Sequence, residues 1–331
     1  MYVEFIDSRL LFSVSDHQTF ESLSLEIFNY QVQNNEVYGR FVANLGIDIQ
    51  SIQEHKNIPY LPIEFFKSQK IISGKSPAEA IFTSSGTSGM VQSQHLVTDV
   101  SVYVDSYRKA FQLFYGDIKE YALLALLPSY QEREGSSLIY MIDDLIGQSN
   151  QEKSGYFLYD HESLKNTMED LQKNKIPTIL IGVTYALLDF VEKHQINFPE
   201  LTVMETGGMK GKRKEILRAE LHKILCNGFG VNSIHSEYGM TELLSQAYSK
   251  GNGIFYCPPW MKVTVRDTND PLSLLGHEQT GGINITDFAN INSCSFIATQ
   301  DLGKTYHNSS FEILGRFDNS DIRGCNLLVQ S

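Results

Sequence analysis

The sequence predicts an α/β fold followed by a small β-rich subdomain. Three apolar runs have the length and composition of strands buried in a parallel sheet, at residues 121–127, 178–181 and 201–204. A loop and amphipathic residues follow each run, and the apolar periodicity predicts helices at 184–194 and 212–225. Beyond Gly251 the pattern changes to short alternating strands between Gly, Asn and Asp turns, at 262–266, 282–286, 295–299 and 311–314.

The segment before the α/β body is predicted to be mainly helical. Apolar residues gather within 20–28, and others recur every four residues from Val37 to Ile49. Pro59 and Pro62 then end any helix, because proline lacks the amide donor and restricts the residue before it. The predicted organisation is a helical lead-in at 1–75, an α/β body at 76–250, a β-rich subdomain at 251–318 and a C-terminal tail at 319–331.

Composition bounds the class of protein and its partners. The 27 basic and 39 acidic residues give a formal net charge of −12, so we expect no nucleic-acid partner. The four cysteines are scattered without CxxC spacing, which indicates neither a zinc module nor a disulfide framework. The first residues lack a signal-peptide pattern, and no apolar stretch reaches the ~18 residues of a membrane span. We therefore expect a cytoplasmic protein without a membrane span.

A loop of hydroxyls and glycines is the strongest local signal for chemistry. It follows an apolar run and consists of Thr83, Ser84, Ser85, Gly86, Thr87, Ser88 and Gly89. Glycine lets backbone amides turn toward phosphate oxygens, and Ser and Thr add donors. The GxxxxGK[ST] pattern of a Walker P-loop is absent. Taken alone, the segment also fits a flexible turn.

A second motif supports the phosphate-binding interpretation, with the sequence Ser-Glu-Tyr-Gly-Met-Thr-Glu at 236–242. With it, the chain resembles the adenylate-forming superfamily of acyl-CoA synthetases, luciferases and related ligases. The resemblance implies that the 83–89 loop binds the phosphates of ATP and that Tyr238, followed by Gly239, packs on adenine. It also implies a phosphate contact for Thr241 and a magnesium ligand in Glu242. The alternative for Tyr238 and Glu242 is an ordinary helix start with a favourable acid.

Further motifs follow in the superfamily's order. The resemblance implies that Asp301 holds the ribose hydroxyls and that Arg316, in a Gly-Arg-Phe-Asp segment, contacts the nucleotide. A narrower resemblance to the LuxE-type acyl-protein synthetases, shared in part by phenylacetate-CoA ligases, is carried by segments 61–67, 127–130, 206–211 and 323–327. It adds Gly207 and Gly208 to the implied nucleotide-binding residues.

The sequence departs from the superfamily pattern in two places. Residues 90–95 after the glycine loop offer no lysine or arginine, only polar neutral groups and His95, so less positive charge reaches the phosphates. Full ligases continue into a C-terminal domain with a catalytic lysine, whereas this sequence ends at Ser331. We therefore expect the large N-terminal domain of that fold without the usual full C-terminal domain. Lys210 and Lys212 could supply charge, or could be solvated lysines at a helix start.

These resemblances imply ATP- and Mg²⁺-dependent activation of a small carboxylic acid, fatty or aryl, as an acyl-adenylate. The acyl group would then pass to a protein thiol. The LuxE-type resemblance makes Cys325 the candidate acyl-enzyme cysteine, because a thiolate is a strong nucleophile; packing as a small apolar residue is the alternative. An acyl-accepting protein or an acyl reductase is a possible partner. The other readings are a non-catalytic nucleotide- or acyl-binding protein and a CoA ligase.

Overall fold

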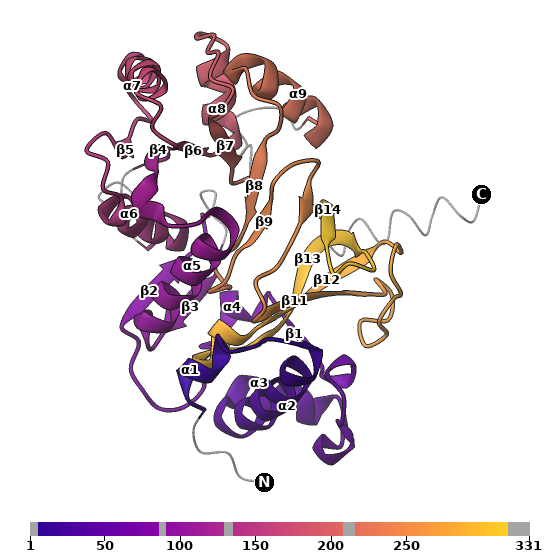
Figure 1. The fold of residues 1–331 in the computed structure, drawn as a ribbon. Helices are drawn as coiled ribbons and strands as arrows, with labels where there is room; N and C mark the ends of the chain where they lie inside the picture. Colours follow the sequence, from indigo (N-terminus) through magenta and orange to yellow (C-terminus); the bar gives the residue numbers. More distant parts are fainter. Residues whose placement is uncertain (1–5, 86–90, 129–134, 208–215, 317–331) are drawn as a thin grey trace, which may run out of the picture.

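The computed structural model of the chain describes residues 6–85, 91–128, 135–207 and 216–316. Figure 1 shows an α/β half in the upper part of the view and a β-rich half with the N-terminal helices in the lower part. In these described ranges no helix has both the length and the hydropathy that crossing a bilayer requires. The mixed α/β fold predicted from the sequence is confirmed.

A mostly parallel sheet forms the centre of the α/β half. Its strands lie in the order β5 (Gly155–Tyr156), β4 (Ala122–Leu126), β6 (Thr178–Gly182), β7 (Thr202–Glu205), β8 (His235–Tyr238) and β9 (Ala247–Ser249). Neighbouring strands are parallel except β9, which runs antiparallel to β8. Every residue of β4 and β6 is buried, which accounts for their continuous apolar sequence. The three predicted strands are confirmed as β4, β6 and β7.

Among the described residues, one helix precedes this sheet in sequence and four others connect its strands. They are α5 (Val100–Tyr115), α6 (Ser137–Gln148), α7 (His161–Lys173), α8 (Thr184–Val191) and α9 (Arg218–Phe229). The predicted helix at 184–194 is confirmed, although it ends at Val191. The predicted helix at 212–225 is confirmed from Arg218 onward as α9, while residues 212–215 lie outside the described residues. Ile216 and Leu217 were wrongly included, because Leu217 has an extended backbone and α9 begins after it. Gly230 ends α9 in the left-handed conformation, where a Cβ would come within 2.7 Å of Asn197 Oδ1.

The β-rich half contains an antiparallel sheet. Its order is β10 (Ile254–Phe255), β14 (Phe311–Arg316), β13 (Phe296–Thr305), β12 (Gly281–Asp287) and β11 (Met261–Arg266). The short strand β1 (Leu61–Pro62) adds a parallel neighbour to β13. The four predicted strands are confirmed, and β13 continues beyond the prediction to Thr305. A separate hairpin joins β2 (Ala80–Thr83) to β3 (Gln94–Val97).

The N-terminal helices pack against this second sheet (Figure 1). They are α1 (Ser8–Leu11), α2 (His17–Asn34), α3 (Glu36–Asn44) and α4 (Phe65–Ser68). Short 3₁₀ turns lie at Ile49–Ser51, His55–Asn57, Ile118–Glu120 and Phe288–Asn292. Phe28 of α2 and Tyr38 of α3 both meet the ring of Phe296 on β13, with ring centroids 6.4 and 6.1 Å apart. The helical lead-in therefore closes the core of the β-rich half.

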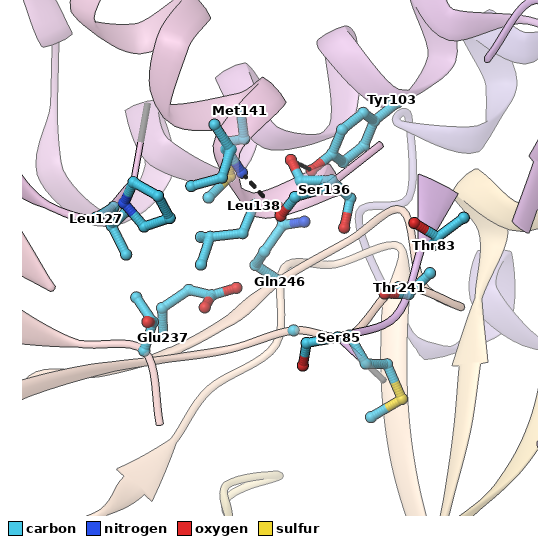
Figure 2. Close-up of a pocket in the computed structure, with 16 residues that line it drawn as sticks. Thr83, Ser85, Tyr103, Leu127, Ser136, Leu138, Met141, Glu237, Thr241 and Gln246 are labelled. Carbon is cyan, nitrogen blue, oxygen red and sulfur yellow. Dashed lines mark hydrogen bonds between the residues drawn. The ribbon is translucent and has the colours of Figure 1, made fainter. Parts of the chain in front are cut away.

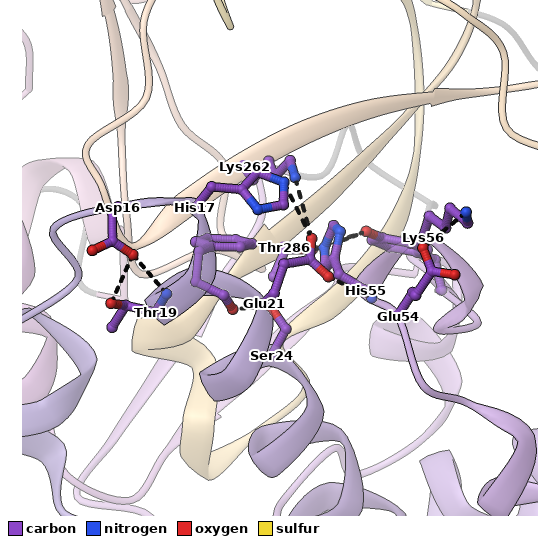
Figure 3. A network of polar contacts seen from close by, with 12 residues as sticks. Asp16, His17, Thr19, Glu21, Ser24, Glu54, His55, Lys56, Lys262 and Thr286 are labelled. Atoms are coloured by element: carbon purple, nitrogen blue, oxygen red, sulfur yellow. Dashed lines mark hydrogen bonds and ion pairs between the residues drawn. The ribbon is translucent and has the colours of Figure 1, made fainter.

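A buried polar network reinforces this packing, as Figure 3 shows. The backbone amide of His55 donates to Glu21 of α2 at 2.9 Å, and the His55 ring lies 2.7 Å from the hydroxyl of Thr286 on β12. Burial lowers the pKa of His55 to about 3, so its ring is neutral at physiological pH. Glu21 also lies 3.8 Å from the ammonium group of Lys262 on β11. These contacts tie α2 to two strands.

We predict that Phe296→Ala lowers the free energy of unfolding by about 3–5 kcal/mol, because removing a fully buried ring leaves a cavity among Phe28, Tyr38 and Tyr60. Urea unfolding followed by circular dichroism measures this loss. The exposed Leu113 on α5 supplies the control Leu113→Ala, expected to stay within about 0.5 kcal/mol of the wild type. A loss below about 1 kcal/mol for Phe296→Ala would contradict the described core.

Candidate functional site

Three of the residues singled out in the sequence meet where the two sheets adjoin. Tyr238, the last residue of β8, donates a hydrogen bond of 2.7 Å from its hydroxyl to Oδ2 of Asp301 on β13. Arg316 on β14 pairs in register with Asp301 and brings its Nε within 3.6 Å of the carboxylate. The interpretation of Tyr238 as part of a helix start is wrong, because it ends a strand and a turn follows.

Burial dominates the electrostatics of this group. It raises the pKa of Asp301, while the hydrogen bond from Tyr238 and the charges of Arg316 and Arg266 oppose the shift. It also raises the pKa of Tyr238 far above its usual value, and the neighbouring Asp301 carboxylate adds to the effect. The hydroxyl of Tyr238 is therefore a permanent donor, and it orients a carboxylate that keeps acceptor capacity for a ligand.

The turn after Tyr238 is held in place by a buried carboxylate on the other sheet. Asp287, at the end of β12, is fully buried and accepts hydrogen bonds from the amides of Leu244, Ser245 and Ala289 and from the Ser245 hydroxyl, at 2.6–3.0 Å. Burial raises the pKa of Asp287 to about 6 in spite of these donors. Asn290 adds a hydrogen bond of 2.8 Å to the carbonyl of Glu242. The side chains of Asp287 and Asn290 thus bond several backbone groups of the turn at once, which fixes its shape.

The buried side chain of His95 also holds this turn in place. Its Nδ1 lies 3.0 Å from the carbonyl of Thr241, and its Nε2 lies 2.8 Å from the hydroxyl of Ser293. Burial lowers the pKa of His95 to about 4, so the ring is neutral; Nδ1 must carry the proton, because a carbonyl can only accept. In the sequence this histidine was noted only as the end of the segment 90–95, which lacks a lysine or arginine after the glycine loop. The structure buries it beneath Thr241.

Glu242 is largely buried, with 6% of its surface exposed. Burial raises its pKa, while a hydrogen bond from Ser93 and the charges of Arg316 and Lys67 oppose the shift. Lys67, on α4, is a cation near this site; its segment 61–67 was singled out in the sequence, but no role at the site was predicted for it. Among the described residues no three His, Cys, Asp or Glu side chains group as metal ligands. Mg²⁺ usually takes one or two protein carboxylates and fills its octahedron with phosphate and water oxygens, so Glu242 alone fits such an ion.

The hydroxyl-rich loop begins at a closed hairpin end. The Ser84 hydroxyl accepts from the Ser93 amide at 3.0 Å, and the Ser84 amide donates to the Ser93 carbonyl at 3.1 Å. Thr83 donates its amide to the carbonyl of Gly135. Gly207 has a left-handed backbone (φ 75°) and donates its amide to Glu205 at 2.8 Å. The predicted site residues that lie outside the described residues are Gly86, Thr87, Ser88, Gly89, Gly208 and Cys325, together with Lys210 and Lys212.

A cavity of about 170 Å³ lies beside this turn. Figure 2 shows Thr83 and Ser85 toward the right of the view, Leu127, Leu138 and Met141 above and to the left, and Glu237 and Gln246 below them. Glu237 curls back over Gly239, where an added Cβ would lie 2.4 Å from its Oε1, so a larger residue at 239 would displace the Glu237 carboxyl group. Burial, aided by the nearby Glu205 carboxylate, raises the pKa of Glu237 to about 8. Glu237 belongs to the motif at 236–242, but the resemblance implied roles only for other residues of that motif, so no role was predicted for Glu237.

Comparison with known proteins identifies the fold. No protein-family model and no curated protein matches the sequence. The ATP-bound structure of MatB from Rhodopseudomonas palustris superposes with a TM-score of 0.54 at 17% identity, over 72% of this chain and 48% of that chain. An open conformation of 2-hydroxyisobutyryl-CoA ligase in complex with 2-HIB-AMP and CoA gives a TM-score of 0.64 at 11% identity, over 91% of this chain and 75% of that chain.

This chain has the fold of the adenylate-forming enzymes. An ATP-bound RpMatB-BxBclM chimera is also similar, with a TM-score of 0.55 at 16% identity over 72% of this chain and 47% of that chain. The chain thus spans about half the length of the MatB structures that it matches. At these identities the similarity concerns the fold, and the chemistry of the site has to be argued from its own residues.

We predict that Glu237 lowers the stability of this protein progressively as the pH rises from about 4.5 to 8, because its carboxyl group must lose a proton in a buried site. Its folded pKa of about 8 lies above the unfolded value of 4.5, so the folded state binds a proton that the unfolded state releases. Glu237→Gln stays neutral at every pH and does not lose stability in this way. At 1.36 kcal/mol per pKa unit, its free energy of unfolding relative to the wild type should increase by up to about 5 kcal/mol toward high pH.

Urea unfolding of both proteins at pH 5 and pH 9 measures the difference. The stability of Glu237→Gln relative to the wild type should increase toward pH 9, and contributions from other groups such as Asp287 cancel in this comparison. Parallel pH profiles would mean that Glu237 titrates at an ordinary value.

Proposed function

We propose that this chain activates a small carboxylic acid with ATP as an acyl-adenylate and passes the acyl group to a thiol. The observation that carries the proposal is the meeting of Tyr238, Asp301 and Arg316 at the junction of the sheets, directly beside a partly open cavity. An aromatic ring, an oriented carboxylate and an arginine are the groups that an adenosine phosphate requires. A separate cavity next to them has room for an acid.

In the proposed reaction the ligands divide between the two parts of the site. The carboxylate of Asp301 accepts hydrogen bonds from the ribose hydroxyls, and Tyr238 packs on adenine. The hydroxyls of Thr83, Ser84, Ser85 and Thr241 donate to phosphate oxygens. Arg316 and Lys67 supply the positive charge that residues 90–95 lack. These donors stabilise the negative charge that develops in the transition state, and their protein contacts fix them before the reaction begins.

The chemical step needs no protein nucleophile. A carboxylate oxygen of the acid attacks the α-phosphorus of ATP, the new O–P bond forms, and the bond to the β-phosphate oxygen breaks to release pyrophosphate. Glu242 would hold Mg²⁺, which on binding supplies charge neutralisation at the phosphates. Held at hydrogen-bonding distance, the acid and the nucleotide react as if in one molecule.

The proposed acceptor of the acyl group is a protein thiol, as the LuxE-type resemblance implies. A thiolate attacks the carbonyl of the adenylate, a thioester forms and AMP leaves. Cys325 is the candidate within this chain, and an acyl-accepting protein or acyl reductase is the candidate partner. CoA is the alternative acceptor. The similar structure of 2-hydroxyisobutyryl-CoA ligase, which contains CoA, supports this alternative. A binding protein without catalysis is the remaining alternative, and the absence of a lysine or arginine from residues 90–95 favours it.

ATP–pyrophosphate exchange with a panel of acids tests the adenylation step. We predict magnesium-dependent exchange for the wild type and at least about a hundredfold loss for Glu242→Gln, because a neutral amide is a poor magnesium ligand. Glu220→Gln, an exposed acid on α9, is the matched control and should keep full exchange. Measurable ATP binding without exchange for any acid would instead support the binding protein.

A labelled acid tests the acceptor. After incubation with ATP and Mg²⁺, we predict hydroxylamine-sensitive label on the protein, located at Cys325 by mass spectrometry and lost in Cys325→Ser. Cys226→Ser, a partly buried cysteine on α9, is the control and should keep the label. A thioester that survives Cys325→Ser, or adenylate without any thioester, would assign the acceptor thiol to another molecule.

A further inference from the structure

The cavity beside the turn has a floor of hydrogen-bond acceptors that the protein leaves without partners. The oxygens Thr206 Oγ1 and Gln246 Oε1 are buried and make no hydrogen bond within the described structure. Glu237 lies next to them with 9% of its surface exposed. An added Cβ at Gly239 would lie 2.4 Å from Glu237 Oε1 and 3.4 Å from Gln246 Cγ, which places the two side chains together.

Unpartnered buried polar atoms are costly, so a group of them in one cavity points to a ligand that completes their hydrogen bonds. The oxygens of Gln246 and of an ionised Glu237 can only accept, and that of Thr206 can also do so. The hydroxyl of Tyr103 already donates to the carbonyl of Ser137 at 2.9 Å and has lone pairs to offer. None of the described residues that line the cavity is Lys, Arg or His. In its neutral form Glu237 has one O–H to donate, but the remaining lone pairs of Glu237, Gln246 and Thr206 outnumber that donor, so the floor favours a ligand that supplies hydrogen-bond donors.

The size of the cavity limits the ligand further. A cavity of 150 Å³ takes a benzene ring, and this one measures about 170 Å³. A compact ligand of roughly six non-hydrogen atoms matches this volume better than a long fatty chain does. The hydrophobic side chains Leu127, Leu138 and Met141 cover one wall, so a short carbon chain fits between them and the polar floor.

We propose that the acid bound by this site is short and carries a hydrogen-bond donor, an amine or a hydroxyl group, at the end opposite its carboxylate. That donor contacts Glu237, Gln246 and Thr206, while the carboxylate faces the nucleotide at Thr241. The inference rests on the proposed function for the direction of the carboxylate, but the donor requirement stands on the cavity itself. An ammonium group would ionise Glu237 and pair with it, whereas a hydroxyl group would exchange hydrogen bonds with its neutral form.

Three acids of equal length separate the possibilities: 4-aminobutyrate, 4-hydroxybutyrate and pentanoate. In ATP–pyrophosphate exchange we expect kcat/KM for the amino acid or the hydroxy acid to exceed that for pentanoate at least about tenfold, because a site built for a donor rejects an analogue that lacks it. Glu237→Gln should abolish a preference for the amine and retain most of a preference for the hydroxyl. Gln246→Leu should reduce either one. The affinity for ATP should stay unchanged in both variants.

Calorimetry with the same three acids keeps this test separate from that of adenylation. If one donor-bearing acid binds at least about tenfold more tightly than pentanoate but supports no exchange, the inference stands and the proposed function fails. If pentanoate is activated or bound as well as the donor-bearing acids, the inference is overturned while adenylation stands. Binding of none of the three acids also overturns it. Glu220→Gln again serves as the control variant.

Discussion

The buried carboxylate of Asp287 is the interaction on which the site depends. It ends a strand of the antiparallel sheet, yet three of its four hydrogen bonds go to the turn that follows the parallel sheet at Tyr238. A buried carboxylate costs free energy unless donors surround it, so the turn and the strand have to be present together. Asn290 and His95 add contacts to the same turn at the carbonyls of Glu242 and Thr241. The candidate site is thus a product of the joint between two sheets.

This joint explains why the site residues come from distant parts of the sequence. Tyr238 ends a parallel strand, Asp301 lies in the middle of an antiparallel one, and one hydrogen bond connects them. The edge of a parallel sheet at the carboxyl ends of its strands is a common place for ligands, and here the second sheet closes that edge. The closure also forms the acceptor-lined cavity, because Glu237 and Gln246 both lie against Gly239 at the start of the fixed turn. Nucleotide and acid would therefore lie on two sides of one rigid segment.

The sequence predicted the strands well because buried parallel strands and alternating antiparallel strands have distinct patterns, as β4, β6 and β12 demonstrate. It also singled out Tyr238, Asp301 and Arg316, which the fold brings together. The roles of His95 and Asp287 could not be predicted, because each acts through a backbone group more than 40 positions away. The roles of Glu237 and Lys67 could not be predicted for a similar reason. They depend on burial and on residues that come close only in the folded chain. The local sequence pattern predicted the helices and strands. The contacts at the joint between the two sheets could be described only from the structure.

The central claim is that Asp301, oriented by Tyr238, holds a nucleotide at the joint of the two sheets. Calorimetric titration of ATP into the wild type, Asp301→Ala and Tyr238→Phe tests it most directly, because Tyr238→Phe removes the hydrogen bond but keeps both the ring and the Asp301 carboxylate. We expect Asp301→Ala to weaken binding by about 1.5–3 kcal/mol, the range for hydrogen bonds to a charged group, and Tyr238→Phe to weaken it much less. Unchanged ATP affinity in Asp301→Ala would contradict the account, as would equal losses in the two variants.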